Sequence, residues 1–117
     1  MLAVGGHLLD ELSDQSLRMA TGFSGGLGDT REELCGALSG GVMVIGALRG
    51  RVSLDEDDQP AIDLAEQYRS RFLSQFGHTQ CVRLRESVVG QPGGPQSCAI
   101  LVESAAKTLL TLLSETT

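Results

Sequence analysis

Three cysteines, Cys35, Cys81 and Cys98, are the residues of this chain best suited to chemistry. Cys81 comes two residues after Thr79, and Cys98 directly follows Ser97, and both of these hydroxyl residues are good helix caps. The first turn of a helix carries free N–H groups and a partial positive charge, which favour the thiolate form of cysteine. If the three helix ends meet in space, we expect a small cluster of activated thiols.

The charged neighbours of these cysteines differ. Glu32 lies three residues before Cys35, and a negative charge there would disfavour ionisation of that thiol. Arg83 and Arg85 follow Cys81 closely and would have the opposite effect. The sequence therefore indicates Cys81 as the better candidate for a reactive thiolate.

The same cysteines could bind a metal, but their spacing is not that of a standard site. The chain has no Cys-x-x-Cys pair, and the gaps between its cysteines are too long for a zinc ribbon. Cys35, Cys81 and Cys98 would need a fourth ligand, for which His78 and His7 are the candidates, although a lone histidine is more often a surface or helix-end residue. The cofactor is left open between an iron–sulfur cluster, another metal and none.

The element that must position Cys35 is a glycine-rich helix within the stretch 22–50. Four glycines in the seven residues of 22–28 predict a turn with positive φ angles. Thr30 is a natural N-cap, and Glu33, three residues later, completes a capping box. We therefore expect a helix over about 31–48, ended by Gly50. Its apolar stripe at helical spacing is Leu34, Leu38, Ile45 and Leu48.

Glycine is frequent inside this helix, at positions 36, 40, 41 and 46. Each internal glycine costs about 1 kcal/mol of helix stability relative to alanine. We expect the compensation to be close approach of another helix or of a bound group to the backbone. Gly36 and Gly40, which follow Cys35, are the positions that we predict to contact a cofactor.

The remaining patterns are also helical. We expect further helices over 2–12, after Ser13 with Leu17, Ala20 and Phe23 inside, over 60–76, over 80–87, and over 97–114. No stretch has a convincing strand pattern. The sequence thus predicts one all-α domain over 1–117, a bundle of about five helices around the glycine-rich helix. The apolar pattern of the first helix has already begun at Met1, which leaves open whether the start of that helix is missing.

The predicted apolar sides of the two longest outer helices complete the core. Their members are Ile62, Ala65, Tyr68, Phe72 and Phe76 in the first, and Ile100, Leu101, Ala105, Leu109 and Leu112 in the second.

Composition excludes some partners. A net charge of −6 and a pI near 4.7 argue against nucleic acid, whose binding depends on clustered lysine and arginine. The longest apolar run is too short and too rich in glycine to cross a bilayer, so we expect no membrane insertion. An odd number of cysteines, without a secretory signal, is typical of a reduced, cytoplasmic protein.

The sequence Cys-Gly-Ala-Leu-Ser-Gly at 35–40 fits a CGAxxG motif, preceded by Gly-Phe-Ser-Gly-Gly-Leu-Gly at 22–28. Together with one cysteine after Phe-Gly-His-Thr-Gln and another at the start of the last predicted helix, this resembles the C_GCAxxG_C_C family of redox-active proteins. The resemblance implies that Cys35 is the motif cysteine and that Cys81 and Cys98 are the third and fourth family cysteines. The first family cysteine, which precedes the opening helix, has no counterpart here.

Two functions fit these observations. In one, clustered thiols carry redox chemistry, either by thiol–disulfide exchange, with Cys81 attacking and Cys98 or Cys35 resolving, or by metal-bound electron transfer. In the other, the chain is a non-catalytic helical module that self-associates through its glycine face, and the cysteines are core residues. Both are compatible with a homodimer. Whether the protein is an enzyme, and what its redox partner is, stay open.

Overall fold

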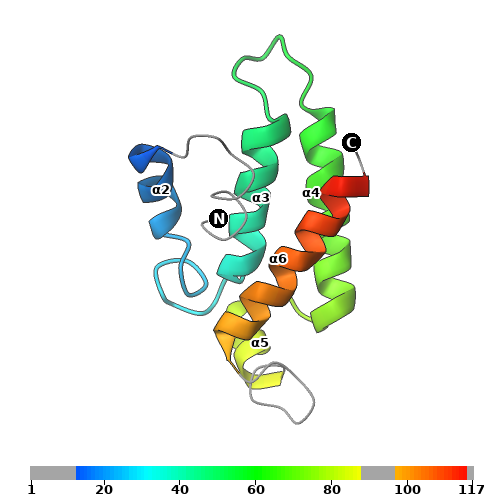
Figure 1. The fold of residues 1–117 in the computed structure, drawn as a ribbon. Coiled ribbons are helices and arrows are strands. Elements are labelled where there is room, and N and C mark those ends of the chain that lie inside the picture. Colours follow the sequence, from blue (N-terminus) through cyan, green and yellow to red (C-terminus); the bar gives the residue numbers. More distant parts are fainter. Residues whose placement is uncertain (1–12, 88–96, 116–117) are drawn as a thin grey trace.

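The structure is a computed structural model that describes residues 13–87 and 97–115. Within these ranges it contains five helices and no strand beyond one isolated bridge (Figure 1). The chain folds as a single all-α domain, as predicted. The helices are α2 (Asp14–Thr21), α3 (Gly36–Arg49), α4 (Gln59–Phe76), α5 (Cys81–Ser87) and α6 (Cys98–Glu115).

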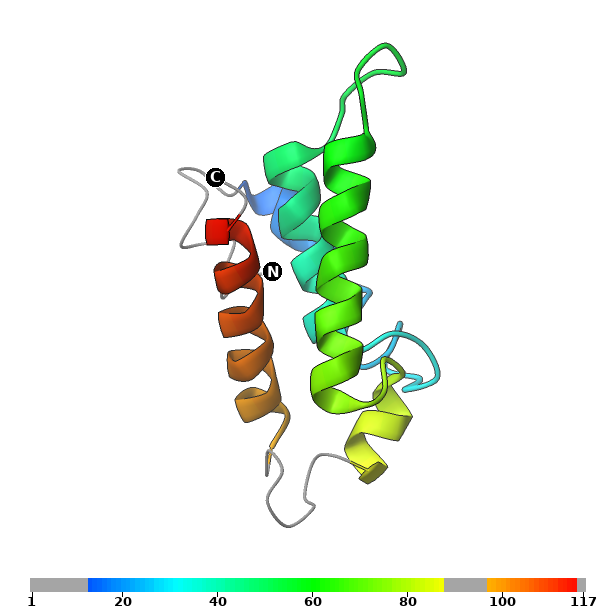
Figure 2. The same cartoon turned by 90° about the vertical axis from the view of Figure 1, so that its right-hand side faces the viewer.

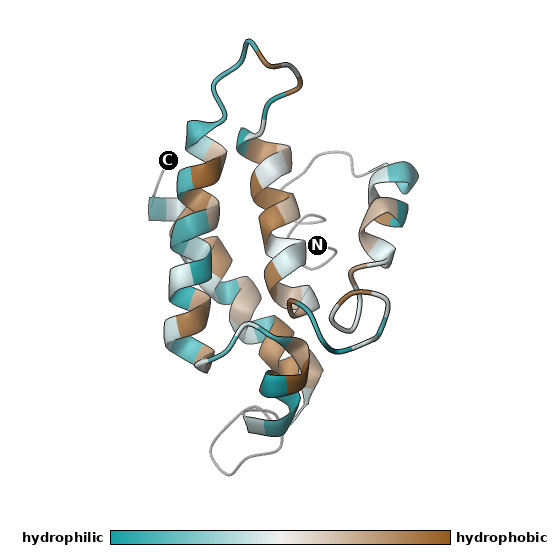
Figure 3. Ribbon diagram, turned by 180° about the vertical axis from the view of Figure 1, so that it is seen from behind, coloured by the Kyte–Doolittle hydropathy of each residue, from teal (hydrophilic) through white to brown (hydrophobic). Residues whose placement is uncertain are grey.

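Helices α3, α4 and α6 pack against one another and enclose the core (Figure 2). In Figure 3, α3 is hydrophobic or neutral along nearly all of its length, whereas α4 has a distinct hydrophilic side. This fits a central position for the glycine-rich helix. The buried core residues are Leu38, Val44, Ile45, Leu64, Tyr68, Phe72, Phe76, Leu84, Leu101, Ala105, Leu109, Leu112 and Leu113.

Helix α4 has the boundaries that its sequence predicts. Pro60 lies in its first turn, where the missing N–H costs nothing. Gly77 ends the helix with a left-handed φ of 80°, and its N–H donates to the carbonyl of Leu73 at 2.7 Å. The aromatic rings inside the helix pack edge to face, with centroids 6.2 Å apart for Tyr68–Phe72.

Helix α3 begins at Gly36, five residues later than the cap at Thr30 predicted (36 against 31). The capping box does not form. Instead the Thr30 hydroxyl turns back to donate to the carbonyls of Gly26 and Leu27, both at 2.9 Å. The physical reason is the backbone before the helix, because left-handed φ angles at Asp29 and Arg31 are incompatible with a right-handed turn there.

Residues 31–35, predicted as the first turn, therefore form an irregular connection, with bends at 31–33 and the bridge residue Leu34 before Cys35. Leu34 pairs with Gln80 in the isolated antiparallel bridge and is 48% exposed, so it is not part of the buried stripe. Cys35 takes the N-cap position, with an extended backbone of φ −56° and ψ 136°. Further along, Leu38 and Ile45 are buried as expected.

The predicted inner sides of the other helices needed smaller corrections. Ile62 and Ile100 are about half exposed; Leu64 is buried in place of Ile62, and Leu101 is buried as predicted. Helix α2 is capped by Ser13, whose hydroxyl accepts the Ser16 N–H at 3.1 Å. It has no buried residue and stands apart from α3, and Phe23 after it is 41% exposed (Figure 1).

The predicted first helix over 2–12 lies outside the described residues. Among the helices that are described, none combines the length and the apolar character needed to span a membrane.

Candidate functional site

All three cysteines lie at helix starts, as predicted for Cys81 and Cys98, whereas Cys35 was expected one turn inside its helix. Cys35 is the N-cap of α3, Cys81 is the first residue of α5, and Cys98 is the first residue of α6. These helix starts gather at the same end of the bundle, opposite the connection from α3 to α4 (Figures 1 and 2). All three thiols are free.

The predicted cap of α6 is confirmed, since the Ser97 hydroxyl accepts the N–H of Ile100 at 3.3 Å.

Backbone hydrogen bonds tie Cys35 to Cys81. The N–H of Cys35 donates to the carbonyl of Thr79, and the N–H of Cys81 donates to the carbonyl of Glu33, both at 2.8 Å. These two bonds flank the bridge between Leu34 and Gln80. The bridge thus places two cysteines that are far apart in the sequence diagonally across one short antiparallel pairing, with Cys35 opposite Thr79 and Cys81 opposite Glu33.

The three thiols differ in exposure and in their electrostatic surroundings. Cys98 is exposed, Cys35 is partly buried, and Cys81 is only 5% exposed. Burial raises the pKa of the Cys35 thiol, and the N–H groups of Ala37 and Leu38 in the first turn of α3 oppose this. Negative charge on Cys81 and Cys98 makes a smaller contribution, which also raises the pKa of Cys35.

Arg85 brings a positive charge to this cluster. It follows Cys81 by one helical turn on α5, and a hydrogen bond between its guanidinium and the Cys81 sulfur is the main cause of its raised pKa. Cys98 and Asp29 add to the same effect. The Nε of Arg85 is buried and has no hydrogen-bond partner in the described part of the chain. Arg83, on the same helix, is exposed.

The glycine-rich turn before α3 covers Cys81. Gly26 is buried, with a φ of +73°, and a Cβ added to it would lie 2.7 Å from the Cβ of Cys81. Sequence reasoning predicted the positive φ angles of this turn but not its contact with a cysteine. The cluster of glycines could have indicated this contact, because glycine in a turn permits both a left-handed backbone and the close approach of another residue.

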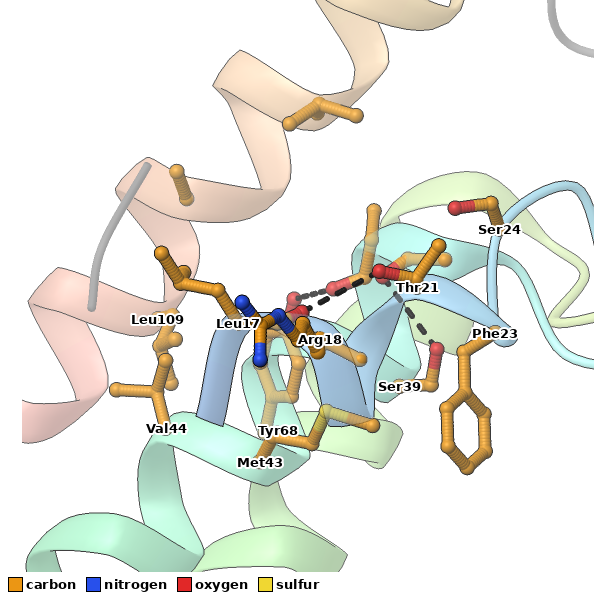
Figure 4. Close-up of a pocket in the computed structure, with 17 residues that line it drawn as sticks. Leu17, Arg18, Thr21, Phe23, Ser24, Ser39, Met43, Val44, Tyr68 and Leu109 are labelled. Carbon is orange, nitrogen blue, oxygen red and sulfur yellow. Dashed lines mark hydrogen bonds between the residues drawn. The ribbon is translucent and has the colours of Figure 1, made fainter. Parts of the chain in front are cut away.

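The two glycines predicted to contact a cofactor, Gly36 and Gly40, lie elsewhere. They line a cavity of about 630 Å³ bounded by α2, α3 and α6 (Figure 4). No cysteine is among the described residues that line it. The close approach expected of the glycine face occurs at Gly41, where an added Cβ would lie 2.4 Å from the ring of Tyr68. The Tyr68 hydroxyl donates to the carbonyl of Ala37 at 2.9 Å (Figure 4).

The described residues do not form a metal site. Within 13–87 and 97–115, no three side chains of the types His, Cys, Asp and Glu are placed to hold one ion. His78 is partly buried in the connection between α4 and α5 and does not complete such a set. His7 lies outside the described residues. What the cluster does offer is sulfur chemistry beside a guanidinium.

One comparison with known proteins gives a result. The model of a family described as "Putative redox-active protein (C_GCAxxG_C_C)" matches residues 1–112. Neither a curated protein nor a solved structure matches the chain.

Proposed function

Since the chain belongs to the C_GCAxxG_C_C family, described as redox-active, we propose that it works by thiol–disulfide exchange between Cys81 and Cys98. The observation that supports this proposal is that the three helix starts carrying free thiols lie at one end of the bundle, where the Arg85 guanidinium is hydrogen-bonded to Cys81. Reversible exchange needs two thiols near each other, one reachable from outside and one able to resolve the mixed disulfide.

Exposure suggests the order of events. An external disulfide can reach Cys98, which is exposed, more readily than Cys81, which is 5% exposed. We therefore reverse the order expected from the sequence, so that Cys98 makes the first attack and Cys81 resolves. Cys35 stays a neutral thiol at neutral pH, because burial raises its pKa.

The reaction is a two-electron exchange with a partner disulfide. The Cys98 thiolate attacks one sulfur of that disulfide, forming a mixed disulfide and releasing the other partner sulfur as a thiolate. The Cys81 thiolate then attacks the Cys98 sulfur, which forms the Cys81–Cys98 disulfide and releases the second partner thiolate. The protein loses two electrons and two thiol protons, and the partner leaves as two thiols. Reduction of the protein is the same sequence in reverse.

Arg85 has a positioning role in this scheme. Its guanidinium is hydrogen-bonded to the Cys81 sulfur and so holds in place the group that must attack the mixed disulfide.

Mass spectrometry after mild oxidation tests the pairing. The protein is oxidised with a small disulfide, its remaining free thiols are alkylated, and the linked peptides are identified. We expect one disulfide between Cys81 and Cys98 that dithiothreitol reverses, and we expect the Cys35→Ser variant to form it too. Cys81→Ser should instead retain the oxidant as a mixed disulfide at Cys98. Cys98→Ser should not react. Three thiols that stay free under these conditions would refute the proposal.

Arg85 and Arg83 offer a matched pair of variants. Arg85→Gln removes the charge beside Cys81 and should slow the second step, so that the mixed disulfide at Cys98 accumulates. Arg83→Gln removes a charge from the exposed side of the same helix and should leave both steps unchanged. Equal rates in the two variants would remove Arg85 from the mechanism.

Two wider predictions accompany this function. Three free cysteines suit a reducing compartment, and we propose the cytoplasm. The homodimer expected from the small residues of α3 would have to use its exposed positions, Gly46 and Ala47, because Gly40 and Gly41 are buried within the subunit. Light scattering of the purified protein gives its mass in solution and tests this directly.

A further inference from the structure

The resolving thiol of the proposed exchange is covered by the chain itself. Cys81 is 5% exposed, and the loop 25–31 lies against it, with the Cα of Gly26 close to its side chain. Figure 2 shows this loop beside the start of α5. A reagent from solution must displace the loop to reach the Cys81 sulfur.

The covering loop has an unusual backbone. Every residue of 25–31 except Thr30 has a positive φ, between 57° and 73°. Three of them, Leu27, Asp29 and Arg31, are not glycine, and side chains disfavour this conformation. The closed loop therefore stores strain that its opening would release.

Hydrogen bonds, more than buried side chains, hold the loop closed. The N–H of Arg31 donates to the carbonyl of Gly25 within the loop, and the N–H of Val82 donates to the carbonyl of Arg31 across to α5, both at 2.7 Å. Leu27, the large apolar residue at its centre, is 47% exposed. Opening thus uncovers little additional apolar surface, and segments of this kind open locally at low free-energy cost.

We propose that the loop 25–31 is a cover that shields Cys81 from external reagents and reserves it for attack on a disulfide already formed at Cys98. This rests on the proposed exchange for its purpose, but the shielding itself is independent of it. With the cover closed, a partner engages Cys98 first, and Cys81 is spared reaction with oxidants in solution.

Two glycines of the loop provide a matched test. Alanine at either Gly26 or Gly28 meets a left-handed φ, of +73° and +62°, but only at Gly26 does the new Cβ collide with Cys81. Iodoacetamide alkylation is followed by mass spectrometry at each cysteine, with the rate at Cys98 as internal reference. We expect Gly26→Ala to raise the rate at Cys81 by roughly tenfold or more, and Gly28→Ala to raise it by roughly threefold. Equal rates at Cys81 in both variants and the wild type would overturn the cover.

Leu27→Gly tests the cover in the opposite direction. Glycine relieves the strain at φ 71° without touching Cys81, so the closed loop becomes more favourable. We expect the rate at Cys81 to fall by roughly threefold. If Gly26→Ala fails to fold, this variant decides alone, and an unchanged or faster rate at Cys81 overturns the proposal.

The two proposals can fail separately. If the loop variants change the alkylation rate of Cys81 but no Cys81–Cys98 disulfide forms, the cover is supported and the exchange is refuted. If a reversible Cys81–Cys98 disulfide forms but the loop variants do not change the alkylation rate of Cys81, the exchange is supported and the cover is refuted.

Discussion

The core and the thiol end of this protein are held together in different ways. The core of α3, α4 and α6 is built from buried side chains, with Val44 and Phe72 fully inaccessible. The thiol end, by which we mean residues 22–35, α5 and the start of α6, depends on backbone hydrogen bonds and on glycine contacts. Within 22–35 and α5, the only buried residues are Gly26, Cys81 and Leu84.

This difference separates stability from reactivity. A core held by apolar burial tolerates few changes, because lost contacts and cavities both cost free energy. A region held by a short ladder and a strained loop can open locally while the core stays folded. We therefore expect core variants to change the free energy of unfolding, and variants of the thiol end to change thiol reaction rates. The predictions below test that separation.

The largest expected effect is in the core. Phe72 is 0% exposed and packs edge to face against Phe76, with ring centroids 4.8 Å apart. Phe72→Ala should lower the free energy of unfolding by about 3–5 kcal/mol, since it removes the buried ring and leaves a cavity. Urea denaturation measures the change. If the free energy of unfolding falls by less than about 1 kcal/mol, the packed core does not supply most of the stability.

The second prediction contrasts two glycines of α3. Gly41→Ala would place a Cβ 2.4 Å from the packed ring of Tyr68, and overpacking of this kind costs about 1–3 kcal/mol. At Gly46 an added Cβ meets nothing within 4 Å, so Gly46→Ala should stabilise the helix by about 1 kcal/mol. The same denaturation experiment should give opposite signs. If both substitutions stabilise the protein, the close approach of the Tyr68 ring does not require glycine at position 41.

The sequence predicted the core better than the thiol end, for a physical reason. Helix α4 was predicted closely because Pro60, Gly77 and its apolar spacing are local signals that agree. The start of α3 was predicted wrongly, because the capping box at Thr30 is also a local signal but competes with a left-handed loop. That loop is stabilised by contacts with α5, which is distant in the sequence.

The candidate site shows the same limit. Helix starts at Cys81 and Cys98 could be predicted from adjacent caps, whereas a cluster of the three thiols was expected only if the helix ends meet. The burial of Cys81 under Gly26 could not be predicted, since it depends on a pairing between 33–35 and 79–81 that no local pattern specifies. Sequence spacing predicted which residues are reactive, but not which of them a reagent can reach.

A third prediction concerns Tyr68, a core side chain whose hydroxyl bonds to the first turn of α3, next to the thiol end. The Tyr68 hydroxyl, in the core, donates to the carbonyl of Ala37, two residues beyond Cys35. Tyr68→Phe keeps the ring and loses this bond, so the free energy of unfolding should fall by about 1 kcal/mol. If the regions are independent, the alkylation rate of Cys35 relative to Cys98 should not change. A faster rate at Cys35 would mean that the core controls the thiol end through this bond.

The smallest effect is expected from alkaline pH. Burial raises the pKa of Cys35 and of Tyr68 above their ordinary values, so the folded protein holds both protons more tightly than the unfolded chain does. Their contribution to stability is complete below the unfolded pKa values and is lost as pH rises through the folded ones. Stability should therefore begin to decline above about pH 9, the ordinary pKa of the thiol.

The variants assign this decline to the two regions. Cys35→Ser removes the thiol, and should therefore flatten the first part of the decline measured by urea denaturation from pH 8 to pH 11. Tyr68→Phe should leave that part unchanged and flatten the decline at higher pH. If Cys35→Ser leaves the whole curve unaltered, Cys35 ionises as easily in the folded protein as in the unfolded chain. Solvent would then reach the thiol end even at Cys35, and this region would be less coupled to the core than the partial burial of Cys35 indicates.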